Sequence, residues 1–260
     1  MLIPPENLAD FGIVDWLVED AVGQGEEVRQ RMVSSSPLSS QLDGEIRVVA
    51  ATGRDSSDYL DKLSRAYGDI VRDAEPRRFS ERVRDLLGAL ENEEKPDAVL
   101  IDSRAGLHDL AALSIVGLAS TALLFATDTA AGWQGYRTLF SFWRSRPEAL
   151  DSLKDRLKMV YALFPETDQA QRARSFLEHS HAVFTETLYE EQGPDLSPDR
   201  FNFAERDTEA PHYPLTIKWN ARFQEFDPLA PDGFGDEASI RASYGDFIDA
   251  VTVMLEGGRP

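Results

Sequence analysis

The stretch Lys95–Asp109, KPDAVLIDSRAGLHD, decides how the fold is predicted from this sequence. A polar segment with a proline is followed by the apolar run Ala98–Ile101, which ends at Asp102. Short apolar runs between turn signals are typical of buried strands. Ligands of open parallel sheets bind beyond the carboxyl ends of the strands, so Asp102 is a candidate for holding Mg²⁺, directly or through water. Apolar runs also end at acids because the chain has reached solvent, and the residues alone leave both interpretations open.

Similar runs recur along the chain and alternate with helical patterns. Strands are predicted over Ile46–Ala51, Ala98–Ile101, Ala122–Ala126, Met159–Phe164 and Ala182–Thr185. Helices are predicted over Asp58–Asp73, Phe79–Leu90, Leu107–Leu118, Trp133–Trp143, Thr167–His179 and Glu237–Leu255. Strands that alternate with helices indicate crossover connections. We therefore expect an α/β fold with a mostly parallel sheet and helices on both faces.

Acids and histidines outside the opening stretch are further candidates. Asp128 and Glu166 follow two other predicted strands, so acids end several strands at one edge of the sheet. His179 and His181 would point apart on a helix, which argues against a shared metal. His212 lies between two prolines and is expected to pack in an extended segment.

Composition limits the classes of protein to which the chain can belong. It has 260 residues and a formal net charge of −19, which argues against nucleic-acid binding over the whole surface. It has no cysteine, which excludes disulfides and thiolate metal sites and is compatible with the cytoplasm, where we expect the protein. The uncharged stretch Leu110–Thr127 approaches the length of a membrane span, but we interpret it as a buried helix followed by a buried strand, with no transmembrane segment.

The amino-acid composition of the chain changes after Tyr189. The following segment is rich in proline, glycine and aspartate and interleaves aromatic residues, which a disordered tail does not normally carry. We expect residues 1–189 to form the α/β domain and residues 190–236 to form an irregular arm packed on it, with Trp219 largely buried. Residues 237–260 are expected to add a C-terminal helix and tail to the same domain.

An ordered series of segments resembles the ParA/MinD-type P-loop ATPases, the family with the KGGVGK(S/T) motif. The stretch PDAVLIDSRAGLHDLAAL is similar to the Walker B and switch II region of that family. The segments FGIVDWLVED, GEIRVVAATG, LLFATD with the following WQGY, YALFPETD and EAPHYPLTIKWN resemble a bacterial subgroup of it. The resemblance covers most of the chain and implies a P-loop NTPase-like α/β fold.

The sequence departs from this family at the phosphate-binding loop. It contains no G-x-x-x-x-G-K-[ST] motif and no lysine-glycine-glycine run, and the G-x-G at Gly23–Gly25 is followed by two acids. The first βαβ unit of the family, roughly 30 residues or more, therefore has no counterpart. We expect a chain truncated at its start, a misassigned start at Met1, or a degenerate ATPase that no longer binds nucleotide.

The resemblance implies roles for individual residues. Asp102 would be the catalytic acid linked to Mg²⁺, Gly106 would sense the γ-phosphate, and Phe164, Pro165 and Thr167 would line the base of ATP. The phosphate-binding lysine and the hydroxyl on Mg²⁺ have no counterpart. Positioning and charge neutralisation supply most of the catalysis of phosphoryl transfer, so Asp102 alone should not sustain hydrolysis.

The resemblance implies a nucleotide-dependent switch that binds ATP and Mg²⁺, dimerises, and recruits a partner protein. ATP hydrolysis is expected only with an upstream Walker A segment, and ATP binding is expected to be lost here. The alternative is a nucleotide-free interaction module of the same fold, which binds a protein through its aromatic arm or an exposed sheet edge.

The resemblance also makes a prediction about the sheet. In the family, the P-loop strand lies between the strands that correspond to Ala98–Ile101 and Ala122–Ala126. Without it, both inner edges would carry unpaired backbone groups, each costing roughly 1–3 kcal/mol when buried. We therefore expect direct pairing of these two strands or a visible defect in the sheet.

Overall fold

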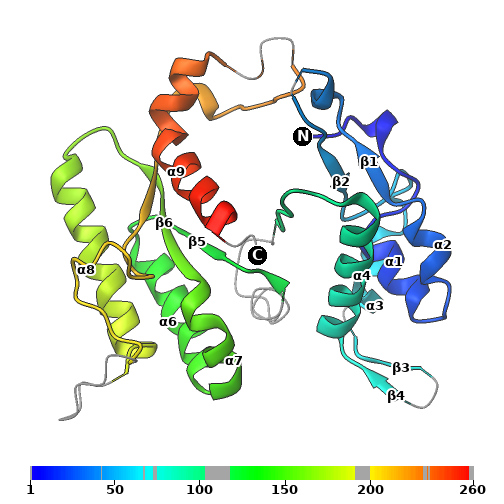
Figure 1. Cartoon of the computed structure of the whole chain (residues 1–260), viewed down its shortest axis with the longest axis horizontal. Helices are drawn as coiled ribbons and strands as arrows, with labels where there is room; N and C mark the ends of the chain where they lie inside the picture. The colour runs from blue at the N-terminus through cyan, green and yellow to red at the C-terminus, as the bar shows by residue number, and fades with distance from the viewer. Residues whose placement is uncertain are drawn as a thin grey trace. The chain divides into compact units, whose positions relative to one another are not determined.

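The structure is a computed structural model that describes residues 2–41, 43–66, 68–72, 75–102, 118–190, 200–230, 233 and 235–257. The chain divides into two compact units, one made of Met1–Asp97 and Glu225–Gly235 and the other of Ala98–Gln224 and Asp236–Pro260. Figure 1 shows the elements of both units along the chain. We refer to them below as unit 1 and unit 2.

Unit 1 is mainly helical. Its elements are η1 (Pro5–Asn7), α1 (Ile13–Asp20), α2 (Gly25–Arg29), β1 (Val33–Ser35), η2 (Pro37–Gln41), β2 (Arg47–Val49), α3 (Tyr59–Ala66), β3 (Ile70–Arg72), β4 (Glu75–Arg77) and α4 (Phe79–Glu94). The strands β1 and β2 form one antiparallel pair, and β3 and β4 form another. Helix α4 ends at Lys95, which takes the left-handed conformation at φ 48°.

A buried carboxylate organises the N-terminal part of unit 1. Asp15 on α1 accepts hydrogen bonds from the backbone of Gly12 at 2.8 Å and of Gly53 at 3.0 Å, and from the ammonium of Lys62 at 2.8 Å. A Cβ atom on Gly53 would lie 2.1 Å from the carbonyl oxygen of Asp10, so the close backbone approach requires glycine here. Asp15 therefore connects α1 to the loop between β2 and α3, through Gly53, and to α3 itself, through Lys62.

Unit 2 is built on a three-stranded parallel sheet in the order β5 (Ala122–Ala126), β6 (Leu157–Phe164), β7 (Leu215–Lys218). The helices α6 (Ala130–Arg144) and α7 (Pro147–Leu153) and the turn η3 (Lys154–Arg156) connect β5 to β6. Helix α8 (Gln169–Thr187) lies between β6 and β7, and the turn η4 (Ala221–Phe223) and helix α9 (Glu237–Gly257) follow β7. Helices α6 and α8 pack side by side, and α9 packs against β7 (Figure 1).

The core of unit 2 lies between the sheet and the helix pair α6 and α8. Alternate residues of β5 are buried there, and they meet aromatic side chains of both helices. Phe176 stacks on Tyr161 of β6, with centroids 4.1 Å apart, and meets Trp133 of α6 edge-on at 4.9 Å. Unit 2 is thus a mixed α/β structure with a parallel sheet flanked by helices, as expected for the fold class.

Several predicted elements are confirmed. The strand Ala122–Ala126 has the predicted bounds, and Met159–Phe164 lies within β6. The helices predicted over Phe79–Leu90, Trp133–Trp143 and Glu237–Leu255 lie within α4, α6 and α9. The helix predicted over Leu107–Leu118 lies outside the described residues, except for its last residue.

Other predictions are wrong. Ala182–Thr185 belongs to α8, and Ile46–Ala51 contributes only the short antiparallel strand β2. The helix predicted from Asp58 to Asp73 ends at Ala66. The arm contains a strand, β7, where the sequence pattern predicted only irregular structure. Trp219 is 42% exposed and not largely buried. It follows the end of β7, where its backbone amide donates to the carbonyl of Phe164.

The most consequential wrong prediction is the strand Ala98–Ile101. These residues have no regular secondary structure and are exposed, with exposed fractions of 41% for Val99, 83% for Leu100 and 44% for Ile101. The direct pairing with Ala122–Ala126 is therefore not formed, and within the described ranges β5 pairs only with β6.

Candidate functional site

The structure does not place Asp102 at the edge of a sheet. Asp102 is exposed at the end of an irregular, exposed segment, whereas the sequence predicted the carboxyl end of a buried strand. The predicted strand is not formed, and within the described ranges no strand pairs with this segment. Gly106 lies outside the described residues. No group of three acidic or histidine side chains that could hold a metal ion occurs in the part of the chain that the structure describes.

The other predicted residues lie at the carboxyl end of β6. Phe164 is buried at the end of the strand, and its carbonyl oxygen accepts a hydrogen bond from the amide of Trp219 at 2.8 Å. Pro165 is half-buried and Thr167 is exposed. Because β5 and β6 are parallel neighbours, these residues share an edge of the sheet with the residues that follow β5. The loop after β6 and Asp128 therefore lie at the same edge of the sheet.

Asp128 is the strand-end acid around which a polar cluster forms. One carboxylate oxygen accepts from the indole Nε1 of Trp133 and from Nδ1 of His179, both at 2.8 Å. The other accepts from the hydroxyl of Ser175 at 2.7 Å. Burial acts to raise the pKa of Asp128, but the hydrogen bonds from Ser175, Trp133 and His179 outweigh it and hold the pKa below its ordinary value.

Local sequence explains how this cluster is assembled. Thr129 caps α6, with its hydroxyl oxygen accepting from the amide of Gly132, and this places Trp133 one turn into the helix beside Asp128. Ser175 and His179 are four residues apart on α8 and therefore lie on one face. The cluster joins the end of β5 to α6 and to α8.

The chemistry available to this cluster is limited by its hydrogen bonds. With Nδ1–H donated to Asp128, the imidazole of His179 is held in one orientation, and its side chain is 55% exposed. Ser175 donates to the same carboxylate and not to His179, so it is not arranged as a nucleophile activated by a base. The cluster is therefore an Asp–His pair at the sheet edge, in which the hydrogen bond to Asp128 fixes the orientation of the imidazole.

A second polar cluster anchors the segment after Phe201 on unit 2. His212 is buried, its Nδ1 accepts from the hydroxyl of Tyr189, and its Nε2–H donates to the carbonyl of Glu205 at 2.9 Å. The hydroxyl of Ser180 donates to the carbonyl of His212 at 2.8 Å. The buried ammonium of Lys158 donates to two carbonyls of the same segment, at Thr208 and Ala210, at 3.1 Å each.

This second cluster confirms two interpretations of the histidines. His212 packs in the segment and is not placed as an exposed base. His179 and His181 point to different partners, Asp128 and the carbonyl of Phe203, so they do not share a site. The sequence carried no signal for Lys158, which stands within the apolar run of β6 and is buried there.

Acid is expected to destabilise unit 2 through His212. Burial lowers its pKa from the ordinary value of 6.5, so the native imidazole is neutral while the unfolded one gains a proton more readily. The resulting stability is fully present above about pH 6.5 and is lost as the pH falls below it. The ring contacts the Tyr189 hydroxyl and the ring of His181. The charges of His181 and Lys158 add to the lowering of the pKa, and that of Asp207 opposes it.

The measurement is the urea midpoint of the wild type and of His212→Gln between about pH 7.5 and pH 5.5, which spans the ordinary range of histidine. The wild type should lose more stability over this interval than the variant. Equal losses in both proteins would show that His212 is not the group that titrates. Asp128 does not interfere, because its lowered pKa places its own loss of stability at lower pH.

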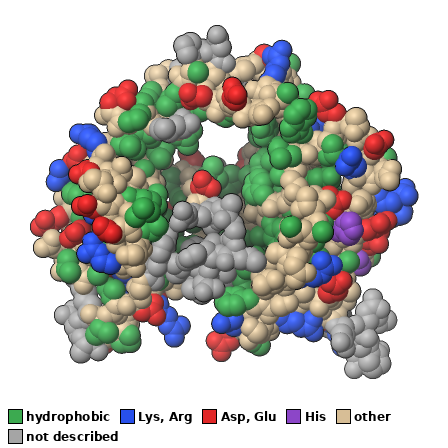
Figure 2. Space-filling model, turned by 180° about the vertical axis from the view of Figure 1, so that it is seen from behind, with side chains coloured by type: hydrophobic (Ala, Val, Ile, Leu, Met, Phe, Trp, Pro, Cys, Tyr) green, Lys and Arg blue, Asp and Glu red, His purple; other side chains and the backbone are tan. Residues whose placement is uncertain are grey.

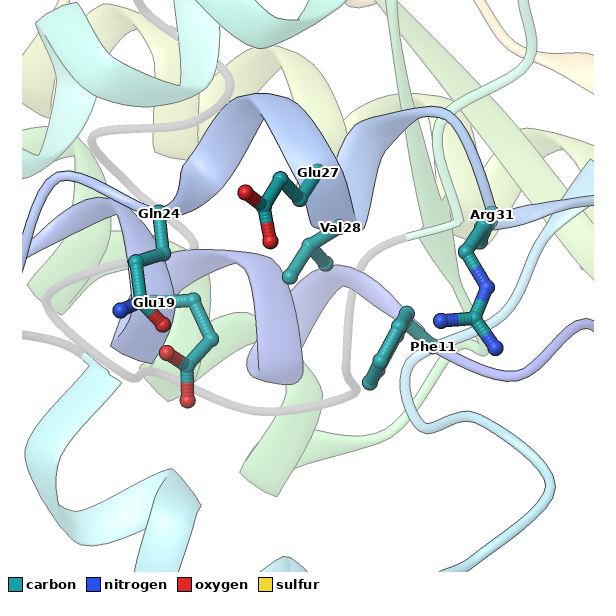
Figure 3. Close-up of a pocket in the computed structure, with 6 residues that line it drawn as sticks. All are labelled: Phe11, Glu19, Gln24, Glu27, Val28 and Arg31. Carbon is teal, nitrogen blue, oxygen red and sulfur yellow. The ribbon is translucent and has the colours of Figure 1, made fainter.

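The structure also has a surface depression in unit 1. It has a volume of about 250 Å³ and is lined by Phe11, Glu19, Gln24, Glu27, Val28 and Arg31 (Figure 3). Arg31 lies over the ring of Phe11 at 5.1 Å and donates to Asp10 at 2.5 Å. The lining mixes both signs of charge on an open surface, and it contains none of the residues predicted from the sequence.

Comparison with known proteins adds no assignment. The chain matches no family model, no curated protein and no solved structure.

Among the described helices, none is long and apolar enough to cross a membrane. On the face shown in Figure 2, basic side chains are interspersed with acidic ones and do not gather into a single patch.

Proposed function

We propose that the chain is a ParA/MinD-like domain that acts through contacts with other proteins and does not bind or hydrolyse ATP by itself. The observation that carries this proposal is the exposure of Ala98–Asp102. The resemblance implies a buried strand and a metal-linked acid at this position. In the structure, the same residues offer an apolar surface instead. The resemblance also implies a cytoplasmic protein.

The fold of unit 2 supports the first half of the proposal. The strands β5, β6 and β7 are parallel, and helices lie between them in the chain. The segments LLFATD, YALFPETD and EAPHYPLTIKWN, which carry part of the resemblance, coincide with these strands and the residues that flank them. Crossover-linked parallel strands of this kind form the sheets of P-loop NTPases.

The residues do not fit ATP and Mg²⁺. In the P-loop families, nucleotide phosphates are held by the backbone amides and the lysine of a glycine-rich loop, and the sequence has no such motif. Asp102 is exposed. The acids that follow β5 and β6, Asp128 and Glu166, come from other segments of the chain. We therefore assign no step of phosphoryl transfer to this chain.

Calorimetric titration with ATP and Mg²⁺ tests the proposal. The expected dissociation constant is weaker than about 1 mM, which corresponds to a binding free energy of about −4 kcal/mol. Asp102→Ala is the matched variant and should give the same weak signal as the wild type. Micromolar binding by the wild type would contradict the proposal, and loss of that binding in Asp102→Ala would support the nucleotide-dependent switch.

A further inference from the structure

An exposed apolar segment in unit 2, Ala98–Ile101, has the composition of a strand but pairs with no strand in the described part of the chain. Leu100 is 83% exposed, and Val99 and Ile101 are each more than two-fifths exposed, at 41% and 44%. Consecutive exposed apolar residues of this kind mark interaction sites, whereas apolar residues exposed singly are common. Branched residues in a short run favour an extended conformation that pairs with another strand.

The same unit has a strand edge that can accept such a segment. Strand β5 is at one end of the order β5-β6-β7, and no strand in the described ranges pairs with its outer side. Its sequence, ALLFA, contains no charged residue and no proline, which are the usual protections of an edge strand. Phe125 is 51% exposed on this strand.

One side chain satisfies part of this edge strand without closing it. The hydroxyl of Tyr136 on α6 donates to the carbonyl of Phe125 at 2.7 Å. A carbonyl oxygen can accept a second hydrogen bond, and the amides of a strand are not satisfied by a hydroxyl on one carbonyl. The edge of β5 can therefore still form a ladder.

We propose that Ala98–Ile101 of one copy of the chain adds as an edge strand to β5 of a second copy, and that the second copy returns the same contact. This deepens the proposed function, on which it rests, by naming the partner protein as another copy of the chain. Each chain carries both the strand and the edge, so a twofold arrangement satisfies two edges and buries two apolar segments at once.

Charge does not oppose the contact locally. Neither Ala98–Ile101 nor β5 contains a charged residue, so the pairing itself brings no like charges into opposition. The net charge of −19 per chain does repel two copies at longer range. Added salt screens such repulsion, so dimerisation should strengthen as ionic strength rises.

Sedimentation velocity over a range of concentrations tests the proposal. The wild type should dimerise, and Leu100→Lys should weaken the dimer by about tenfold or more, because the substitution removes an apolar side chain from the contact. Leu60→Lys is the matched control, since Leu60 is 75% exposed on α3 of unit 1 and should not affect dimerisation. Both leucines are exposed, so neither substitution should unfold the protein. A monomeric wild type, or equal effects of the two variants, overturns the proposal.

Single cysteines identify the paired segments, because the chain has no cysteine of its own. Leu100→Cys and Ile101→Cys are each mixed with Phe125→Cys under oxidising conditions. Neighbouring residues of a strand point to opposite faces, so one of the two should share the face of Phe125 and form a disulfide between copies. Leu60→Cys mixed with Phe125→Cys should form none.

The outcome is read from the mass of the cross-linked species. A disulfide between two chains supports the proposal. A chain that carries both cysteines, one in the segment and one at Phe125, is oxidised in parallel. A disulfide within that chain, with none between the mixed single variants, would mean that the segment pairs with its own β5, and it overturns the assignment of the partner. Failure of dimerisation with undetectable ATP binding would reject this inference alone, whereas micromolar ATP binding would reject the proposed function.

Discussion

Replacing Asp20 by alanine is expected to destabilise unit 1 by about 3–5 kcal/mol, the range found when one partner of a buried ion pair is removed. Asp20 at the end of α1 accepts a hydrogen bond from Nε of Arg82 on α4 at 2.7 Å. The side chain of Arg82 is 0% exposed and that of Asp20 is 7% exposed. Without the carboxylate, the guanidinium would remain buried beside the carbonyls of Leu17 and Gly68, with no opposite charge bonded to it.

Urea unfolding followed by circular dichroism measures this effect. The double variant Asp20→Leu with Arg82→Met should recover most of the loss, because apolar pairs of similar volume often replace buried ion pairs without penalty. Asp249→Ala breaks an exposed pair with Arg241, at 64% and 57% exposure, and should cost less than about 1 kcal/mol. A loss for Asp20→Ala as small as that for Asp249→Ala would show that the buried pair does not hold α1 to α4.

Truncating Phe176 to alanine is expected to destabilise unit 2 by about 3–5 kcal/mol, as for other fully buried aromatic residues. Phe176 is 0% exposed and contacts Tyr161 of β6 and Trp133 of α6 from its position on α8. Its loss removes the ring that joins the sheet to both helices and leaves a cavity that rigid aromatic neighbours cannot fill.

Tryptophan fluorescence during urea unfolding reports this change, because Trp133 and Trp143 are buried in the same cluster. Leu163→Ala is the control. Leu163 is 59% exposed near the end of β6, with a left-handed backbone at φ 54°. Alanine carries a Cβ as leucine does, so the backbone cost is shared and the truncation should change stability by less than about 0.5 kcal/mol. Similar midpoints for the two variants would argue against the aromatic cluster as the core of the unit.

The fold of unit 2 was partly predictable because some apolar runs are followed in the sequence by the helix that buries them. Ala122–Ala126 became β5 because the following aromatic helix α6 covers its buried face. Ala98–Ile101 has the same texture but remains exposed, since burial of a strand depends on a neighbour that the run itself does not specify. Local composition therefore indicated a strand in both places and was right in one.

The run Ala182–Thr185 failed for a different reason. Val183 and Phe184 follow Phe176 at the spacing i+7 and i+8, and all three are buried on one face of α8. Four apolar residues taken alone indicate a strand, but in the longer window they continue a helical stripe. The tetrapeptide LTIK of β7 was missed because it is short and is surrounded by turn residues.

The candidate site was predictable only at its centre. The sequence placed Asp128 at a strand end, but Ser175 and His179 come from a helix that follows the next strand, and no spacing rule relates them to Asp128. Asp102 was selected by resemblance and by its position after an apolar run. The structure shows that run to be exposed and irregular, so the buried strand end that the prediction assumed is not formed.

The position of β7 in the chain has a consequence for synthesis on the ribosome. Strand β6 is the centre of the sheet, yet its partner β7 comes only after α8 and the segment anchored by His212. A nascent chain that has not yet reached Leu215 holds β5 and β6 as a two-stranded ribbon, with the β7 side of β6 unpaired. Two-stranded sheets are marginally stable, and open strand edges promote aggregation. The nascent chain is therefore expected to be most prone to aggregation before β7 has been synthesised.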